Sequence, residues 1–143
     1  MSKLAALQAT YAPYVLAALR VITGLLYVQH GTQKLFNFPE NLRNPPAADA
    51  EIATFTLITG LLEFVGGSLF AIGLLTRPVA FLLSGMMAVA YFMAHAPRSF
   101  YPINNNGDLA ILFSFVFLYF FFSGPGAFSV DGAIARNKGA AAP

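Results

Sequence analysis

Long apolar stretches alternate with short polar segments along the whole chain, a pattern typical of membrane-spanning helices. Four stretches are each close to the roughly 20 residues that a hydrocarbon core about 30 Å thick requires. They cover residues 14–35, 53–75, 79–95 and 109–122. The pattern predicts an all-α fold, a transmembrane four-helix bundle, with residues 1–143 forming one domain.

Turn-forming residues mark the connections between these helices. Arg77-Pro78 makes a very short connection, whereas residues 37–51 and 96–107 form longer loops rich in Pro or Asn. Ser, Gly and Pro at residues 123–126 end the fourth helix. We expect the polar tail, residues 126–143, to be loosely ordered at its end.

The distribution of charge predicts the orientation in the membrane. The termini and the Arg77 turn carry Lys3, Arg77, Arg136 and Lys138 against Asp131, whereas the long loops carry Arg43 and Arg98 against Glu40, Asp49 and Glu51, with Asp108 at the rim. Since cytoplasmic segments are enriched in Lys and Arg, both termini are predicted to be cytoplasmic.

Composition supports the membrane class and excludes several functions. Charged residues make up only 10% of the chain, against about 25% in a soluble domain, and the mean hydropathy is +0.66. A bacterial inner (plasma) membrane protein in contact with the lipid bilayer is expected. Basic residues are scattered without a run, which argues against nucleic acid. With no Cys, a thiol redox centre or Cys-ligated cluster is excluded within this chain, and no metal site or covalent cofactor is predicted.

Charged and hydrogen-bonding residues inside the apolar stretches are the candidates for function. Glu63 lies near the middle of the second stretch, where an unpaired carboxylate costs roughly 2.5–3.5 kcal/mol on insertion scales. On the first stretch Arg20, Tyr27, His30 and Lys34 share one helix face within about 120°, beside Gly24 and Gly31. We expect Arg20 first, or else His30 or Lys34, to pair with Glu63, and His95, Arg98 and Asp108 to join this polar stripe.

The stripe has two interpretations. In the first interpretation the stripe is structural, and a buried Arg20–Glu63 ion pair only fixes the helix register. Lys34 then reaches the membrane interface, and the tyrosines form an interfacial belt. The number of polar groups on one face favours the other, a pocket for a quinone head group or a small anion. The Phe-rich fourth helix is expected to pack in the core or face lipid.

At these residues the sequence resembles the DoxX family of small four-helix membrane proteins. The matching segments are RVITG at residues 20–24, HGTQKLF at 30–36, TGLLEFVGG at 59–67, IGLLTR at 72–77, NGD at 106–108 and GPGAFSVD at 124–131. The resemblance implies that Arg20, His30, Lys34 and Glu63 are the typical polar set, and that Asp108 replaces a more usual Glu. It also implies quinone-linked chemistry, since founding members look like membrane subunits of a thiosulfate–quinone or quinol oxidoreductase, and others are associated with oxidative-stress complexes.

Together these observations predict a quinone- or small-molecule-binding subunit that serves a redox partner protein and lacks its own redox centre. The predicted ligand-binding residues are Arg20, Tyr27, His30, Lys34, Glu63, His95, Arg98 and Asp108. A small transporter or permeation subunit for an organic molecule or anion, and a structural or assembly factor, remain alternatives. A homodimer is also expected to be compatible with the small perimeter of the bundle.

The predicted orientation can be tested by cysteine labelling. A cysteine placed at Ala47 is expected to react with a membrane-impermeant reagent added to intact cells, whereas one at Ala141 is not. The chain has no native Cys, so each variant carries one thiol. Labelling at position 141 but not at 47 would show the opposite orientation and contradict the prediction.

Overall fold

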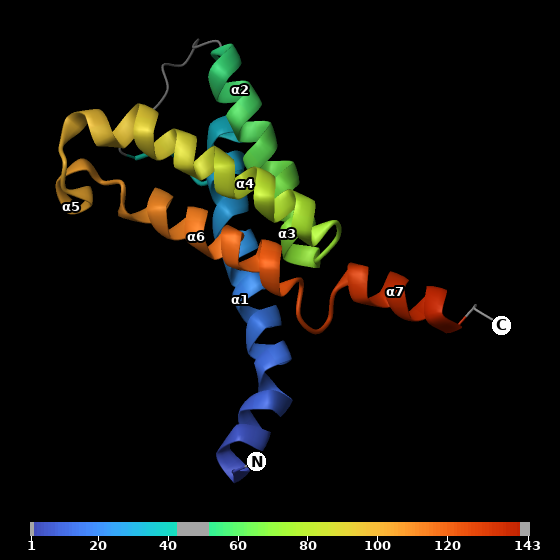
Figure 1. Ribbon diagram of the computed structural model, residues 1–143. Helices are drawn as coiled ribbons and strands as arrows, with labels where there is room; N and C mark the ends of the chain where they lie inside the picture. The colour runs from blue at the N-terminus through green and yellow to red at the C-terminus, as the bar shows by residue number, and fades with distance from the viewer. Residues whose placement is uncertain (1, 43–51, 141–143) are drawn as a thin grey trace.

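The computed structural model describes residues 2–42 and 52–140, and every regular element in these ranges is a helix. The predicted all-α fold class is therefore confirmed (Figure 1). In chain order the elements are α1 (Lys3–Phe36), α2 (Thr54–Leu61), the π-helical segment η1 (Leu62–Gly66), α3 (Gly67–Ile72), α4 (Thr76–Ala90), the π-helical segment η2 (Tyr91–His95), the 3-10 turn η3 (Ala96–Arg98), α5 (Pro102–Asn105), α6 (Asp108–Ser123) and α7 (Val130–Ala140).

Three helical stretches in the described ranges are long and apolar enough to cross a membrane: Lys3–Phe36, Thr54–Ile72 and Thr76–Arg98. The second joins α2, η1 and α3, and the third joins α4, η2 and η3. α6 is also apolar but has 16 residues, which is about 24 Å of helix. The chain is a membrane protein with several apolar helices. Four spans and cytoplasmic termini remain predictions.

The structure contains more helix near both termini than was predicted. α1 begins at Lys3 instead of residue 14, because Ser2 caps it by accepting a hydrogen bond from the Ala5 N–H, and the following residues are rich in Ala, the strongest helix former. The polar tail contains α7, a helix that was not predicted. Figure 1 shows the first turns of α1 and all of α7 projecting from the other helices. The labelling positions Ala47 and Ala141, and the loop charges Arg43, Asp49 and Glu51, lie outside the described residues.

α1 packs tightly, through glycines, against the continuous helix that α2, η1 and α3 form (the α2–α3 rod). A Cβ atom on Gly31 would lie 2.5 Å from the Phe64 backbone nitrogen, and one on Gly24 would lie 2.7 Å from the Ala71 Cβ atom. On the facing rod, a Cβ on Gly67 would lie 2.9 Å from a Val28 methyl carbon. Such small residues let transmembrane backbones approach closely. These glycines, Gly24, Gly31 and Gly67, form a glycine seam that sets the register between the two helices.

α4 and α6 form the second closely packed pair. Ser84 donates its hydroxyl hydrogen to the Ser114 carbonyl at 2.9 Å, and Ser114 donates to the Ser84 carbonyl at 3.1 Å. Phe113, Phe117 and Phe120 of α6 are buried with Phe70 of α3, as the core-packing expectation for this helix required. Phe115 and Phe122 are exposed on the opposite side. The interior between the pairs is therefore filled mainly by aromatic rings.

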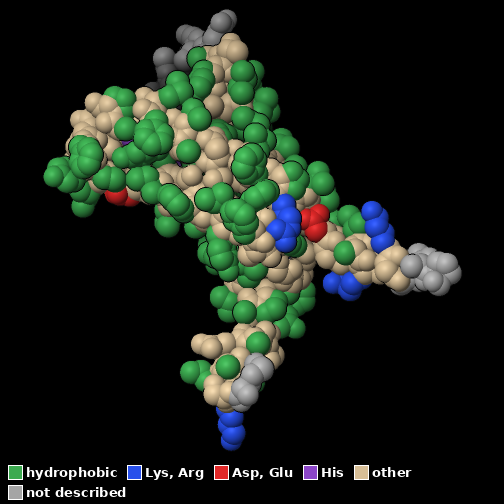
Figure 2. All heavy atoms as spheres, in the orientation of Figure 1, with side chains coloured by type: hydrophobic (Ala, Val, Ile, Leu, Met, Phe, Trp, Pro, Cys, Tyr) green, Lys and Arg blue, Asp and Glu red, His purple; other side chains and the backbone are tan. Residues whose placement is uncertain are grey.

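The surface carries apolar side chains over the long helices and charged side chains mainly at the ends. Figure 2 shows hydrophobic side chains spread over the bundle, with Lys and Arg gathered near α7 and at the free end of α1. Many large apolar residues of α1, α2, α4 and α6 are exposed, among them Leu25, Ile58, Leu82 and Leu112. Lipid contact explains this exposure, because hydrocarbon solvates such side chains without cost.

The glycine seam can be tested with two matched substitutions. Gly31→Ala is expected to lower the free energy of unfolding by about 1–3 kcal/mol, because its new methyl group collides with the backbone of the neighbouring helix. Gly85→Ala is the control, since a Cβ there meets nothing within 4 Å. Chemical denaturation in detergent measures both. Equal stability of the two variants would contradict the role of the seam.

Candidate functional site

A cavity of about 780 Å³ lies between α1, α2, η1, α4, η2 and α6. Its volume falls within the range of small-molecule sites, about 300–1,000 Å³. Most of its wall is apolar, with Leu62, Met87 and Phe113 among the contributors. The polar residues on its wall are Tyr27, His30, Lys34, Thr59, Glu63, His95 and Asn106.

The structure brings five of the eight predicted site residues to this cavity: Tyr27, His30, Lys34, Glu63 and His95. Arg20, Arg98 and Asp108 are not part of the wall, and the last two are exposed. Sequence reasoning missed Thr59, Asn106 and the methionines. The run of three Asn residues and the Met86-Met87 pair were visible signals, but turn and core residues have the same composition.

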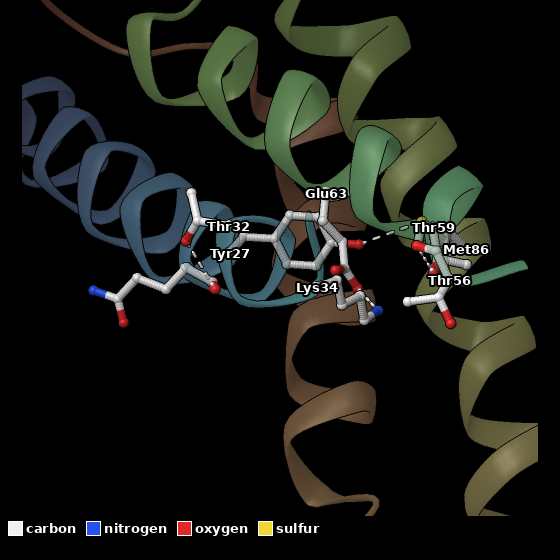
Figure 3. A network of polar contacts seen from close by, with 8 residues as sticks. Tyr27, Thr32, Lys34, Thr56, Thr59, Glu63 and Met86 are labelled. Carbon is white, nitrogen blue, oxygen red and sulfur yellow. Dashed lines mark hydrogen bonds and ion pairs between the residues drawn. The ribbon is translucent and has the colours of Figure 1, made fainter. Parts of the chain in front are cut away.

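Glu63 pairs with Lys34 inside the cavity wall. The Lys34 Nζ atom donates to Glu63 Oε1 at 2.6 Å. Figure 3 marks this contact with a dashed line. Glu63 is 3% exposed, whereas the Lys34 side chain is 36% exposed. The other carboxylate oxygen, Oε2, is buried and has no hydrogen-bond partner among the described residues. Within the described part of the chain, therefore, only one of the two carboxylate oxygens is paired.

The prediction that Arg20 is the first partner of Glu63 was wrong, and Lys34, one of the two alternatives, is the partner. The reason is the register of the glycine seam. Gly31 contacts the backbone at Gly60 and Phe64, so Lys34, about one turn further along α1, lies level with Glu63. Arg20 lies lower, roughly 21 Å from the level of Lys34 along α1 at 1.5 Å per residue.

Arg20 instead holds the segment that leads into α7. Its side chain, which is 1% exposed, donates to four carbonyl groups, and those of Pro125, Ala127 and Phe128 all belong to that segment. The fourth is the carbonyl of Ala71 in α3, at 3.2 Å from Nε. Several hydrogen bonds to carbonyl dipoles replace an anionic partner here. Arg20 therefore fixes the end of the chain rather than the cavity.

Asp131, on the first turn of α7, caps the start of α4. Its two carboxylate oxygens accept hydrogen bonds from the Leu75 and Thr76 N–H groups, each at 2.8 Å. Burial alone raises the pKa of Asp131, but these hydrogen bonds and the nearby Arg20 charge outweigh it, so the pKa lies below its usual value. The charged carboxylate is favoured at a helix N-terminus.

Tyr27 and His30 complete the α1 wall of the cavity. Tyr27 is 1% exposed, and its hydroxyl donates to the Met86 sulfur at 3.5 Å, a weak acceptor. Figure 3 shows the Tyr27 ring lying beside Glu63. The belt interpretation of Tyr27 is therefore wrong. His30 is more exposed and packs edge-on against Phe113 at a ring distance of 6.1 Å.

His95 stands on another wall, where a network of backbone and amide groups positions it. Its Nδ1 atom lies 3.0 Å from the Asn105 carbonyl oxygen. The buried Asn105 side chain donates to the Ser99 carbonyl and accepts from the Gly107 N–H, which holds the loop in place. Because a carbonyl oxygen only accepts, Nδ1 carries the proton, and Nε2 of the neutral ring is an acceptor.

Two π-helical segments contribute residues to this cavity. η1 contains Glu63 and η2 contains His95. Short π-helical segments are rare and occur frequently at functional sites, because the extra residue in a turn redirects side chains. Their presence on two walls of one cavity is independent support for a site there.

The cavity combines one ion pair, two imidazoles and a phenol in apolar surroundings. In the described part of the chain no group of three or more His, Asp or Glu could hold a metal ion. Imidazole and carboxylate groups can bind polar atoms of a ligand and exchange protons with it. The arrangement is suited to an apolar molecule that carries a small polar head.

Comparison with known proteins identifies related membrane proteins. The DoxX family matches residues 15–96, which include every cavity residue from α1 to η2. An uncharacterized protein of Haemophilus influenzae is 43% identical over 130 residues, covering 89% of this chain and 96% of that protein. An uncharacterized membrane protein of Mycobacterium tuberculosis is 29% identical over 148 residues, covering 87% and 84%. No solved structure matches this chain.

The Lys34–Glu63 pair can be tested by a double-mutant cycle. Breaking a fully buried pair costs about 3–5 kcal/mol. Because Lys34 is partly exposed, we expect Lys34→Met to cost about 2 kcal/mol, and Glu63→Gln to cost less than Glu63→Ala. The double variant Lys34→Met/Glu63→Gln should recover much of the loss. Arg20→Lys with Glu63→Gln is the control and should be additive. Coupling of Arg20 rather than Lys34 to Glu63 would contradict the observed pairing.

Asp131 predicts how stability depends on pH. Its folded-state pKa is depressed, so its contribution is complete above the unfolded value of about 3.9 and is lost as pH falls through the lower folded value. Asp131→Asn should therefore show a flatter fall in unfolding midpoint between about pH 5 and pH 2 than the wild type. Parallel curves for the two proteins would exclude this role for Asp131.

Proposed function

This chain belongs to the DoxX family, and we propose that it is an inner-membrane subunit that binds a lipid-soluble small molecule of the quinone type for a redox partner protein. The observation that carries the proposal is the cavity itself. It is apolar over most of its wall, yet it contains the Lys34–Glu63 pair and two imidazoles. Ligand sites typically combine such apolar walls with a few placed polar groups.

Access from the bilayer supports a lipid-soluble ligand. Phe55 and Met93 line the cavity and are 68% and 66% exposed, so its wall continues onto the apolar outer surface of the helices. A water-soluble molecule would have to leave water and cross that surface. A molecule that already partitions into hydrocarbon reaches the cavity without this cost.

The packing on the other side of the cavity favours binding over conduction. Phe70, Leu83 and Phe117 are fully buried and fill the interior between the cavity and the Arg20 end of the molecule. A permeation path through the bundle would require these side chains to move apart. Transport is therefore the less favoured alternative.

In this proposal the bound ligand and the partner protein carry out the redox chemistry, and this chain does not. A quinone-type ring carries electrons itself, and the resemblance to subunits of quinone-linked oxidoreductases supplies the class of partner. This chain would contribute the head-group contacts. Lys34 has N–H donors beyond the one bound to Glu63, so it can donate to a carbonyl oxygen. His30, which faces the cavity, offers an imidazole that can form a hydrogen bond with a polar atom of the head group.

The proposal predicts that a small lipid-soluble molecule co-purifies with the protein and depends on the cavity. Mass spectrometry of extracts from protein in nanodiscs identifies it. Ala94→Trp, which places a large ring on the cavity wall, should abolish this association. Leu112→Trp is the control, because Leu112 is exposed on α6 outside the cavity.

The two variants separate the competing functions. Loss of the molecule in Ala94→Trp but not in Leu112→Trp supports the proposal. Association that is equal in both variants would indicate ordinary lipid carry-over. Flux of an organic anion into liposomes, blocked by Ala94→Trp, would favour the transporter instead.

A further inference from the structure

The Glu63 carboxylate is a buried acceptor whose hydrogen bonds are incomplete. A carboxylate has room for about four hydrogen bonds, but Glu63 accepts one, from Lys34 to Oε1. Oε2 has no partner in the residues that the structure describes. Buried polar groups without partners are uncommon, since each costs free energy comparable to a lost hydrogen bond. A hydrogen-bond donor placed beside Glu63 Oε2 would therefore stabilise the carboxylate.

The position of Glu63 directs that requirement to the cavity. Glu63 is part of the cavity wall, and it is held in η1 by a backbone that packs against α1. The terminal torsion of a Glu side chain is soft and roughly two-fold. Oε2 is shielded in the structure, and a rotation about this torsion can therefore turn it toward the cavity while the flexible Lys34 side chain follows Oε1. A group in the cavity can then donate to the oxygen that Lys34 does not hold.

Lys34 adds the complementary requirement. Its ammonium group has three N–H donors, and its hydrogen bond with Glu63 uses one of them. A head group beside this pair is thus offered an acceptor and a donor next to each other. A hydroxyl can satisfy both, because it donates once and accepts as well. A carbonyl or ether oxygen satisfies only Lys34.

His95 extends the same preference across the cavity. Its Nδ1–H donates to the Asn105 carbonyl oxygen, so the free ring nitrogen, Nε2, is an acceptor. His95 lines the cavity from η2, whereas Glu63 lines it from η1. Two walls therefore present acceptors, which matches a ring with hydroxyl groups.

We propose that the head group bound in this cavity carries a hydroxyl that donates to Glu63 and accepts from Lys34. The ligand class is a lipophilic phenol or aromatic diol, which is the reduced form of a quinone-type ring rather than its dicarbonyl form. This inference rests on the proposed function, because it assigns the chemistry of the same cavity. Glu63 is then the residue that selects the hydroxyl form.

A pair of ligands that differ only by methylation of the hydroxyl tests this selection in the wild-type protein. The probes are para-octylphenol and its methyl ether, measured by equilibrium binding to protein-containing nanodiscs, with empty nanodiscs correcting for partition into lipid. The phenol should bind at least about tenfold more tightly, the factor that one further hydrogen bond of about 1.4 kcal/mol produces. Equal binding of the two overturns the inference but leaves the proposed function standing.

Substitution of Glu63 locates the preference. Glu63→Gln presents an N–H donor in place of one oxygen, so the phenol's advantage should disappear or reverse in favour of the ether. Glu40→Gln is the matched control, because Glu40 is exposed and lies outside the cavity wall, and it should keep the wild-type ratio. An unchanged ratio in Glu63→Gln overturns the role of Glu63. If neither probe binds and no small molecule co-purifies, both the inference and the proposed function fail.

Discussion

The close contact between α1 and the α2–α3 rod is the constraint on which the candidate site depends. Gly31 lies against the backbone of Gly60 and Phe64, and no larger residue fits there without displacing one helix. This contact fixes the rise of one helix relative to the other. Lys34 is thereby placed level with Glu63, and a buried carboxylate obtains a cation. Without the seam, the pair would lose its register and the cavity one of its walls.

The molecule is divided along its length into a packed end and a hollow end. At the packed end, Phe70, Phe117 and Phe120 stack edge to face, with ring centroids 4.9 Å apart in the two Phe70 contacts. At the hollow end the walls separate around the cavity, and both π-helical segments occur there. Rigid packing on one side can hold the polar groups of the other in place, which is what a preorganised binding site requires.

Two basic side chains of α1, Lys34 and Arg20, have their charge compensated in different ways. Lys34 neutralises an anion, whereas Arg20 satisfies its guanidinium with carbonyl groups of α3 and of the segment before α7. The difference follows the chemistry of the side chains. Arg has several N–H donors in a planar fork that can serve many acceptors, while Lys is a compact point charge. Arg20 thus ties the C-terminal segment to the bundle, where Asp131 caps α4.

The sequence alone determined the membrane class, the all-α fold and the approximate location of the apolar helices, because hydropathy and segment length follow directly from what a bilayer solvates. It also singled out Tyr27, His30, Lys34, Glu63 and His95, which the fold brings to one cavity, since polar side chains are rare in such helices. Only the tertiary structure decided that Lys34 rather than Arg20 meets Glu63. Helix periodicity places residues on a face but says nothing of the relative height of two helices, and that height is set by which glycines touch which backbone. The helix in the tail was likewise invisible to hydropathy, because Asp131 of α7 binds the start of α4 and Arg20 holds the segment before α7, and neither contact is apolar.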